Sequence, residues 1–151
     1  MVIDTGRTGA AAEKLVTGQL LRRGLDAFEA YARSPGYDVV VASPNGTSQV
    51  RVQVKASSGG RANPWVYVKA KSCRQFDVLV FVDLGGEREN YHVIPEALLW
   101  TSHHVPLAGS AEHEGMTLKS IARLDACKDA WHNITDLLAS RAAAIAASEA
   151  S

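Results

Sequence analysis

The residues best suited to chemistry lie in two short runs, YDVVV at 37–41 and RVQVK at 51–55. Side chains two apart on a strand share one face. Gln53 and Lys55 would therefore point away from the face formed by the valines of the second run. The valines suit a core, whereas an amide beside an ammonium needs polar partners.

Asn45-Gly46 separates the two runs and is a strong signal for a two-residue β-hairpin turn. A hairpin centred there places Asp38 opposite Gln53, with Cβ atoms about 4.5–5.5 Å apart. That gap suits one cation held between a carboxylate and an amide oxygen, with Lys55 next on the same face. A longer symmetric loop over SPNGTS keeps this register, whereas a β-bulge would shift it.

A helix predicted over residues 7–24 carries another acid. Gly9, Glu13, Val16 and Leu20 fall on one helical face. An acid on an otherwise apolar face needs a partner, and a metal ion or Lys55 would supply one. Two carboxylates, an amide oxygen and nearby main-chain carbonyls make an oxygen site that suits Mg²⁺.

Simpler interpretations exist for the same residues. Asp38 and Lys55 could form a cross-strand ion pair, which contributes little on an exposed face. Glu13 could be a solvated helix residue. His103, His104 and His113 follow no zinc-site spacing.

The surrounding elements must position these side chains. Strands are predicted around 27–31, in both arms of the 37–57 hairpin, and over 65–70, 75–84 and 90–95. A short helix follows from Pro95 through Trp100, residues 101–118 look irregular, and the pattern is helical from 119 onward. This order predicts an α/β fold with a central mixed sheet of about five strands flanked by helices. Residues 1–151 would form one domain with a C-terminal helical extension, and Trp65, Tyr67, Phe76, Phe81 and Trp100 are expected in the core.

Composition constrains the class of protein. The 151 residues carry sixteen basic and sixteen acidic side chains, so the formal net charge is zero and any basic surface must be local. The two cysteines, Cys73 and Cys127, are far apart, which favours free thiols in a reducing compartment. Without an apolar signal region or membrane span, a cytoplasmic location is expected.

The order of a helix Glu, a hairpin Asp and a QxK strand resembles the PD-(D/E)XK nuclease superfamily over about residues 7–95. The matching motifs are G-x3-E at 9–13, Y-D-V-V-V at 37–41 and V-Q-V-K at 52–55. The Gln variant is most similar to a branch that includes an intron-encoded homing endonuclease and relatives of archaeal Holliday junction resolvases. Tyr37 stands where the superfamily often has Pro. Gln53 replaces an acid, which removes one negative charge and should weaken metal binding.

The resemblance implies a restriction-endonuclease-like core and Mg²⁺- or Mn²⁺-dependent hydrolysis of DNA phosphodiesters, on duplex or branched DNA, by a homodimer or higher oligomer. Asp38 would be the central metal ligand, joined by the Gln53 side-chain oxygen and the Val54 carbonyl. Glu13 would bind the metal through water or orient the site. Lys55 would position or deprotonate the attacking water and stabilise charge on the phosphate.

Basic and hydroxyl side chains around Lys55 could hold the phosphate backbone. The candidates are Arg51, Ser57, Ser58, Arg61, Lys69 and Lys71. The loop after Lys55 could equally be a solvated connection, and Arg51 could instead pair with an acid. Two other functions stay open: a nucleic-acid-binding module of this fold that has lost cleavage, and a subunit that binds protein only.

Overall fold

The computed structural model describes residues 5–31, 36–59, 61–70, 75–101, 104–110 and 112–151. Its main sheet has five strands in the order β1 (Asp26–Glu29), β2 (Val39–Ala42), β3 (Gln49–Ser57), β5 (Val78–Asp83) and β6 (Asn90–Pro95). β3 and β5 are parallel, and the other neighbours are antiparallel. The predicted α/β class, with a mixed sheet of five strands flanked by helices, is confirmed.

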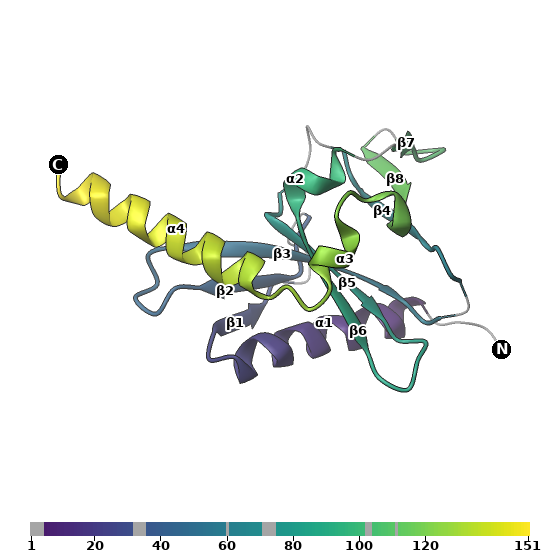
Figure 1. The fold of residues 1–151 in the computed structure, drawn as a ribbon, viewed down its shortest axis with the longest axis horizontal. Coiled ribbons are helices and arrows are strands. Elements are labelled where there is room, and N and C mark those ends of the chain that lie inside the picture. The colour runs from purple at the N-terminus through teal and green to yellow at the C-terminus, as the bar shows by residue number, and fades with distance from the viewer. Residues whose placement is uncertain (1–4, 32–35, 60, 71–74, 102–103, 111) are drawn as a thin grey trace.

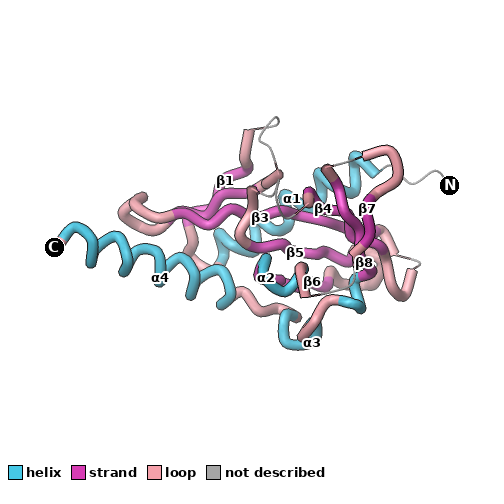
Figure 2. The backbone as a smooth tube through the Cα atoms, turned by 90° about the horizontal axis from the view of Figure 1, so that it is seen from above, coloured by secondary structure: helices cyan, strands magenta, loops and turns pink. Residues whose placement is uncertain are grey.

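Two long helices pack on the valine face of this sheet. α1 (Thr5–Arg22) buries Ala12, Val16 and Leu20 against the valines of β2 and β3. α1 ends in a Schellman motif, in which Leu25 N–H donates to the Leu20 carbonyl and Gly24 has φ 79°. α4 (His132–Glu149) joins the same core, runs alongside the β2–β3 hairpin and extends past it at its C-terminal end (Figures 1 and 2).

The opposite face of the main sheet is covered by a second, three-stranded sheet and short helices. β4 (Trp65–Lys69) and β7 (Val105–Pro106) both pair antiparallel with β8 (His113–Thr117). α2 (Glu96–Leu99), the 3₁₀ helix η1 (Leu118–Ser120) and α3 (Leu124–Cys127) complete this layer. Its core includes Leu79, Phe81, Ile94, Leu99 and Met116. Figure 2 shows the two sheets from above.

The prediction of an irregular segment over residues 101–118 is wrong, because this part of the chain contains β7 and β8. The sequence of β8, HEGMT, has low β propensity, and its pairing with β4 overrides that propensity. The continuous helix expected from residue 119 is also wrong. Arg123 and Asp129 adopt left-handed φ values of 57° and 50°, so the chain bends twice before α4 begins.

The register of the β2–β3 hairpin is confirmed, since Val39 pairs with Val52 and Val41 with Val50. The two-residue turn is wrong. Ser43 N–H donates to the Ser48 carbonyl, which closes a longer loop, and Gly46 takes φ 71° inside it. The loop is symmetric about Asn45-Gly46, so the strands keep the predicted pairing.

Candidate active site

Asp38 lies one residue before β2 and is tied to β3 by three hydrogen bonds. Its N–H donates to the Val52 carbonyl at 2.8 Å. Its Oδ2 accepts from Val54 N–H at 2.8 Å and from Gln53 Nε2 at 2.6 Å. Because β2 pairs with β3 only up to Val52, the carboxylate takes the Val54 N–H that a further strand residue would otherwise bind. The side chain is thereby fixed where the two strands separate.

Lys55 and Asp38 carry opposite charges and interact electrostatically at this point. Burial lowers the pKa of the Lys55 ammonium, and the Asp38 carboxylate opposes that shift. Burial raises the pKa of Asp38, against the opposing effects of the Val54 hydrogen bond and Lys55. Both charged forms are therefore held in surroundings that disfavour charge.

Glu13 reaches the same site from α1. The buried stripe of α1 runs through Ala12, Val16 and Leu20, so Glu13 lies partly buried beside that stripe and not within it. Burial raises the pKa of Glu13, and the negative charge of Asp38 raises it further. Two neighbouring acids with raised pKa values form a site that a cation would stabilise.

Gln53 contacts Asp38 directly, as the register predicts, but through its NH₂ group. The Nε2 atom of Gln53, and not its Oε1 oxygen, is therefore the atom that faces the Asp38 carboxylate. Nε2 also lies 3.4 Å from the Val54 carbonyl oxygen. A half-turn of the amide would present Oε1 in place of Nε2, so the same side chain can act as a donor to Asp38 or as an oxygen ligand.

The donor set fits a divalent cation with oxygen ligands. Asp38, Glu13, the Gln53 amide and the Val54 carbonyl supply only oxygen, which Mg²⁺ and Mn²⁺ prefer. Within the described part of the chain, no three His, Cys, Asp or Glu side chains gather in a metal-binding group. The site thus has two carboxylates and not three, consistent with the charge that Gln53 removes.

A cleft of about 570 Å³ opens beside Lys55. The start of α1, the end of β3, the loop after it and β4 surround it. Its lining includes three of the predicted DNA-binding residues, Ser57, Ser58 and Arg61, together with Thr5, Thr8, Gly9, Trp65 and Tyr67, which were not predicted there. The alternation of β4 is the sequence feature that could have placed the aromatic pair together, because Trp65 and Tyr67 share one face of that strand.

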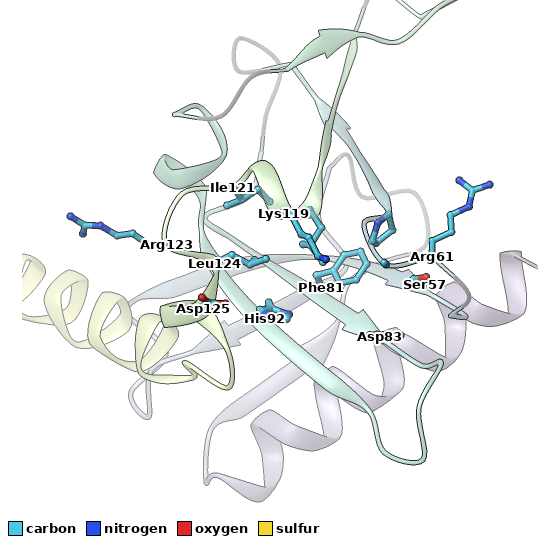
Figure 3. Close-up of a pocket in the computed structure, with 13 residues that line it drawn as sticks. Ser57, Arg61, Phe81, Asp83, His92, Lys119, Ile121, Arg123, Leu124 and Asp125 are labelled. Atoms are coloured by element: carbon cyan, nitrogen blue, oxygen red, sulfur yellow. The ribbon is translucent and has the colours of Figure 1, made fainter.

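A second cleft, of about 600 Å³, lies on the same face of the main sheet (Figure 3). Lys55 is in register with Phe81, and Phe81 with His92, so these three side chains form a row across β3, β5 and β6. Phe81 and His92 line the second cleft, which shares Ser57 and Arg61 with the first. In Figure 3 the Arg61 side chain extends away from the cavity.

Of the other predicted DNA-binding residues, Arg51 and Lys69 do not line the cleft beside Lys55. Arg51 is 3.6 Å from Asp77, so of its two predicted roles the structure shows the ion pair. Lys69 is partly buried on β4, and Lys71 lies outside the described residues. None of the described helices is long and apolar enough to cross a bilayer.

These features define a class of fold. The mixed sheet, the α1 helix bearing Glu13 and the β2–β3 hairpin bearing Asp38, Gln53 and Lys55 keep the order of elements on which the resemblance to the PD-(D/E)XK nucleases rests. Comparison with solved structures confirms that resemblance at the level of the fold. The chain is similar to the bacterial homing endonuclease I-Ssp6803I, with a TM-score of 0.66 and 20% identity, over 93% of this chain and 99% of that one.

The Holliday junction resolvase Hjc of Archaeoglobus fulgidus is a more distant match, with a TM-score of 0.47 and 14% identity. It covers 75% of this chain and 86% of its own. No protein-family model matches the chain, and no curated protein sequence matches it.

Proposed function

We propose that this protein is a metal-dependent endodeoxyribonuclease that hydrolyses DNA phosphodiester bonds at the Asp38–Glu13–Lys55 site. The observation that carries the proposal is the fixed Asp38 carboxylate. It is held by Val54 N–H and Gln53, and it lies in the field of a partly buried acid and a partly buried ammonium. A purely structural Asp38–Lys55 ion pair would not need Glu13 nearby. The repulsion between Glu13 and Asp38 makes the charged form of each acid less favourable.

Asp38, Glu13, the Gln53 amide oxygen and the Val54 carbonyl would hold Mg²⁺ or Mn²⁺. When bound, the ion supplies a water of lowered pKa and neutralises charge that develops on the phosphate. Lys55 borders the cleft beside Asp38, where its ammonium would stabilise the same phosphate charge. Because burial lowers the pKa of Lys55, this side chain also gives up a proton more readily than an ordinary lysine.

Ser57, Ser58 and Arg61 would hold the phosphate backbone on either side of the cut, since all three line the cleft that contains Lys55. Cutting both strands of a duplex requires two such sites. We therefore extend the proposal to a homodimer or higher oligomer.

The test is nicking of supercoiled plasmid and cleavage of branched DNA in Mg²⁺ or Mn²⁺. Wild type is compared with Asp38→Ala and Lys55→Ala, and with Asp26→Ala and Lys128→Ala as matched controls at exposed positions. We expect metal-dependent cutting that both site variants lose and both control variants keep. Cutting that survives in Asp38→Ala would place the activity elsewhere or in a contaminant.

A second function is favoured by one observation. Gln53 donates a direct hydrogen bond to Asp38, so this carboxylate has a side-chain partner within the protein. A DNA-binding module that no longer cuts would show salt-dependent DNA binding with no cleavage on any substrate and no metal heat by calorimetry. That result would replace the nuclease proposal.

A further inference from the structure

Two large aromatic side chains are exposed next to the candidate active site. Trp65 is 44% exposed and Tyr67 39% exposed, although both were expected in the core. Their strand, β4, already has a core face, which is formed by Val66 and Val68. The aromatic pair therefore occupies the outer face, where its burial contributes nothing to the core of the domain.

The two rings are parallel and held in place. Their centroids are 6.0 Å apart, and their planes differ by 13°. Gly115 of β8 lies directly opposite Tyr67, and a Cβ on Gly115 would lie 2.5 Å from Tyr67 Cε1. The Tyr67 ring thus rests on glycine backbone that any larger residue would obstruct. A platform fixed in this way loses little entropy when a flat ligand stacks on it.

The same rings line the cleft that contains Lys55. Cationic and hydroxyl side chains complete this wall of the cleft: Lys55, Ser57, Ser58 and Arg61. Aromatic faces beside cations match the chemistry of single-stranded nucleic acid, in which each phosphate is accompanied by a base that is free to stack. The bases of an intact duplex are stacked on one another, so only unpaired bases can use these rings.

We propose that Trp65 and Tyr67 bind unpaired nucleobases beside the cleavage centre. The preferred substrate would then be DNA with a single-stranded segment next to the cut, such as a flap, a fork or an open junction. The preference for cutting such DNA rests on the proposed nuclease function. The binding of unpaired bases does not, so the two can be tested separately.

The first test uses the full chain in EDTA, where metal-dependent cutting is blocked. The probes are an oligothymidylate of about 12 nucleotides, the same oligomer with abasic sugars at its central positions, and a duplex of equal phosphate count. We expect the single strand to quench tryptophan fluorescence, because Trp65 is exposed whereas Trp131 is buried and Trp100 is partly buried. Removing one stacked base should weaken binding by about 5- to 150-fold.

Variants repeat the test from the protein side, with binding measured by the fluorescence anisotropy of labelled probes, because Trp65→Leu removes the tryptophan whose quenching reports on the wild type. Trp65→Leu should weaken single-strand binding by a similar factor and change duplex binding much less. Phe28→Leu is the matched control, since Phe28 is 59% exposed on β1. Thermal unfolding of each variant checks that the protein is folded, and the abasic probe needs no variant at all.

The outcomes separate the two proposals. Equal affinity for the abasic and the intact oligomer, or equal weakening for duplex and single strand in Trp65→Leu, would overturn the stacking proposal. If either of those results is found and Trp65→Leu cuts intact duplex at the wild-type rate, only the nuclease proposal remains. Base-dependent binding without cleavage on flapped or forked DNA would leave the stacking proposal standing and remove the nuclease.

Discussion

Two aspartates flank β3 with the same local design and opposite electrostatics. Asp38 lies on the β2 side and Asp77 on the β5 side, each one residue before its strand. Asp38 N–H donates to the Val52 carbonyl, and Asp77 N–H donates to the Arg51 carbonyl. Each carboxylate accepts a main-chain N–H from β3 at 2.8 Å, from Val54 and from Arg51 respectively. The backbone thus treats the two residues alike.

Their surroundings differ. Asp77 accepts hydrogen bonds from both terminal guanidinium nitrogens of Arg141, each at 2.8 Å. The guanidinium of Arg51 lies 3.6 Å away. Its pKa is lowered, because these hydrogen bonds and charges outweigh its burial. The pKa of Asp38 is raised, because burial outweighs one hydrogen bond and Lys55. The charge of Asp77 is balanced by arginines within the fold, whereas the charge of Asp38 is not fully balanced by Lys55.

The direction of the pKa shift and the set of partners therefore distinguish a structural aspartate from a candidate functional one, although both residues are aspartates. A paired carboxylate with a lowered pKa pins α4 to the sheet. A carboxylate with a raised pKa, next to a second acid and near the cleft that Lys55 lines, is the pattern on which the proposed cation site rests.

The largest effect expected is on catalysis. Asp38→Asn should reduce the metal-dependent cleavage rate by about 10²–10³ or more, as expected for removal of one electrostatic group that acts on the transition state. Asp77→Asn should leave the rate per folded molecule unchanged. Single-turnover cleavage, normalised to the folded fraction, measures both. A large loss in Asp77→Asn would show that the two sites are coupled and would break the comparison.

The second effect is on stability and has the opposite pattern. Asp77→Ala should lower the free energy of unfolding by about 1.5–3 kcal/mol, because it removes hydrogen bonds to a charged partner and leaves Arg141 unpaired. Asp38→Asn should raise the free energy of unfolding at neutral pH, because burial favours the neutral side chain. Urea denaturation measures both, with Asp26→Ala as a control at an exposed position. Loss of stability in Asp38→Asn would make that residue a structural anchor as well.

The pH dependence should separate the two aspartates by sign. The folded-state pKa of Asp77 is lowered, so its stabilisation is present above the ordinary pKa of about 3.9 and lost as pH falls through the folded value. The folded-state pKa of Asp38 is raised, so its stabilisation is present below about 3.9 and lost as pH rises through the folded value.

From pH 6 to pH 3 (roughly the range in which carboxyls titrate), the stability of wild type should therefore fall relative to Asp77→Asn. Relative to Asp38→Asn it should rise. Urea denaturation at several pH values gives both differences. Two differences that change in the same direction would contradict the assigned environments.

The sequence was sufficient for the Asp38–Gln53 contact but not for the Asp77–Arg141 contact. Hairpin register follows from local turn chemistry, and a symmetric loop preserved it even though the turn was longer than expected. Asp77 and Arg141 are 64 positions apart. Their contact depends on where α4 docks, which no local pattern encodes.

The second sheet escaped prediction for a similar reason. β8 has weak strand propensity, and its Gly115 makes sense only under the Tyr67 ring of a strand 48 positions earlier. The usual burial of large aromatic side chains predicts a core position for Trp65 and Tyr67. The strand alternation shows that one face of β4 must be outward, but only the packing of β4 on the main sheet decides which one.

The smallest effect expected concerns Gln53. Gln53→Glu would supply the acid that the superfamily pattern has at this position and set it against Asp38. Without metal, the lost Nε2 hydrogen bond and the new repulsion should lower the free energy of unfolding by about 0.5–1.5 kcal/mol. With metal, the added charge should reduce the half-saturating Mg²⁺ concentration on the order of 5- to 10-fold.

Thermal unfolding in EDTA and in a Mg²⁺ series measures both effects of Gln53→Glu. Gln49→Glu, at the exposed start of β3, is the matched control. A larger Mg²⁺-induced stabilisation in Gln53→Glu than in Gln49→Glu would place the ion between residue 53 and Asp38. Equal stabilisation in the two variants would mean that the raised pKa values of Asp38 and Glu13 arise from burial that no metal relieves. The two sides of β3 would then differ only in how fully each carboxylate is paired.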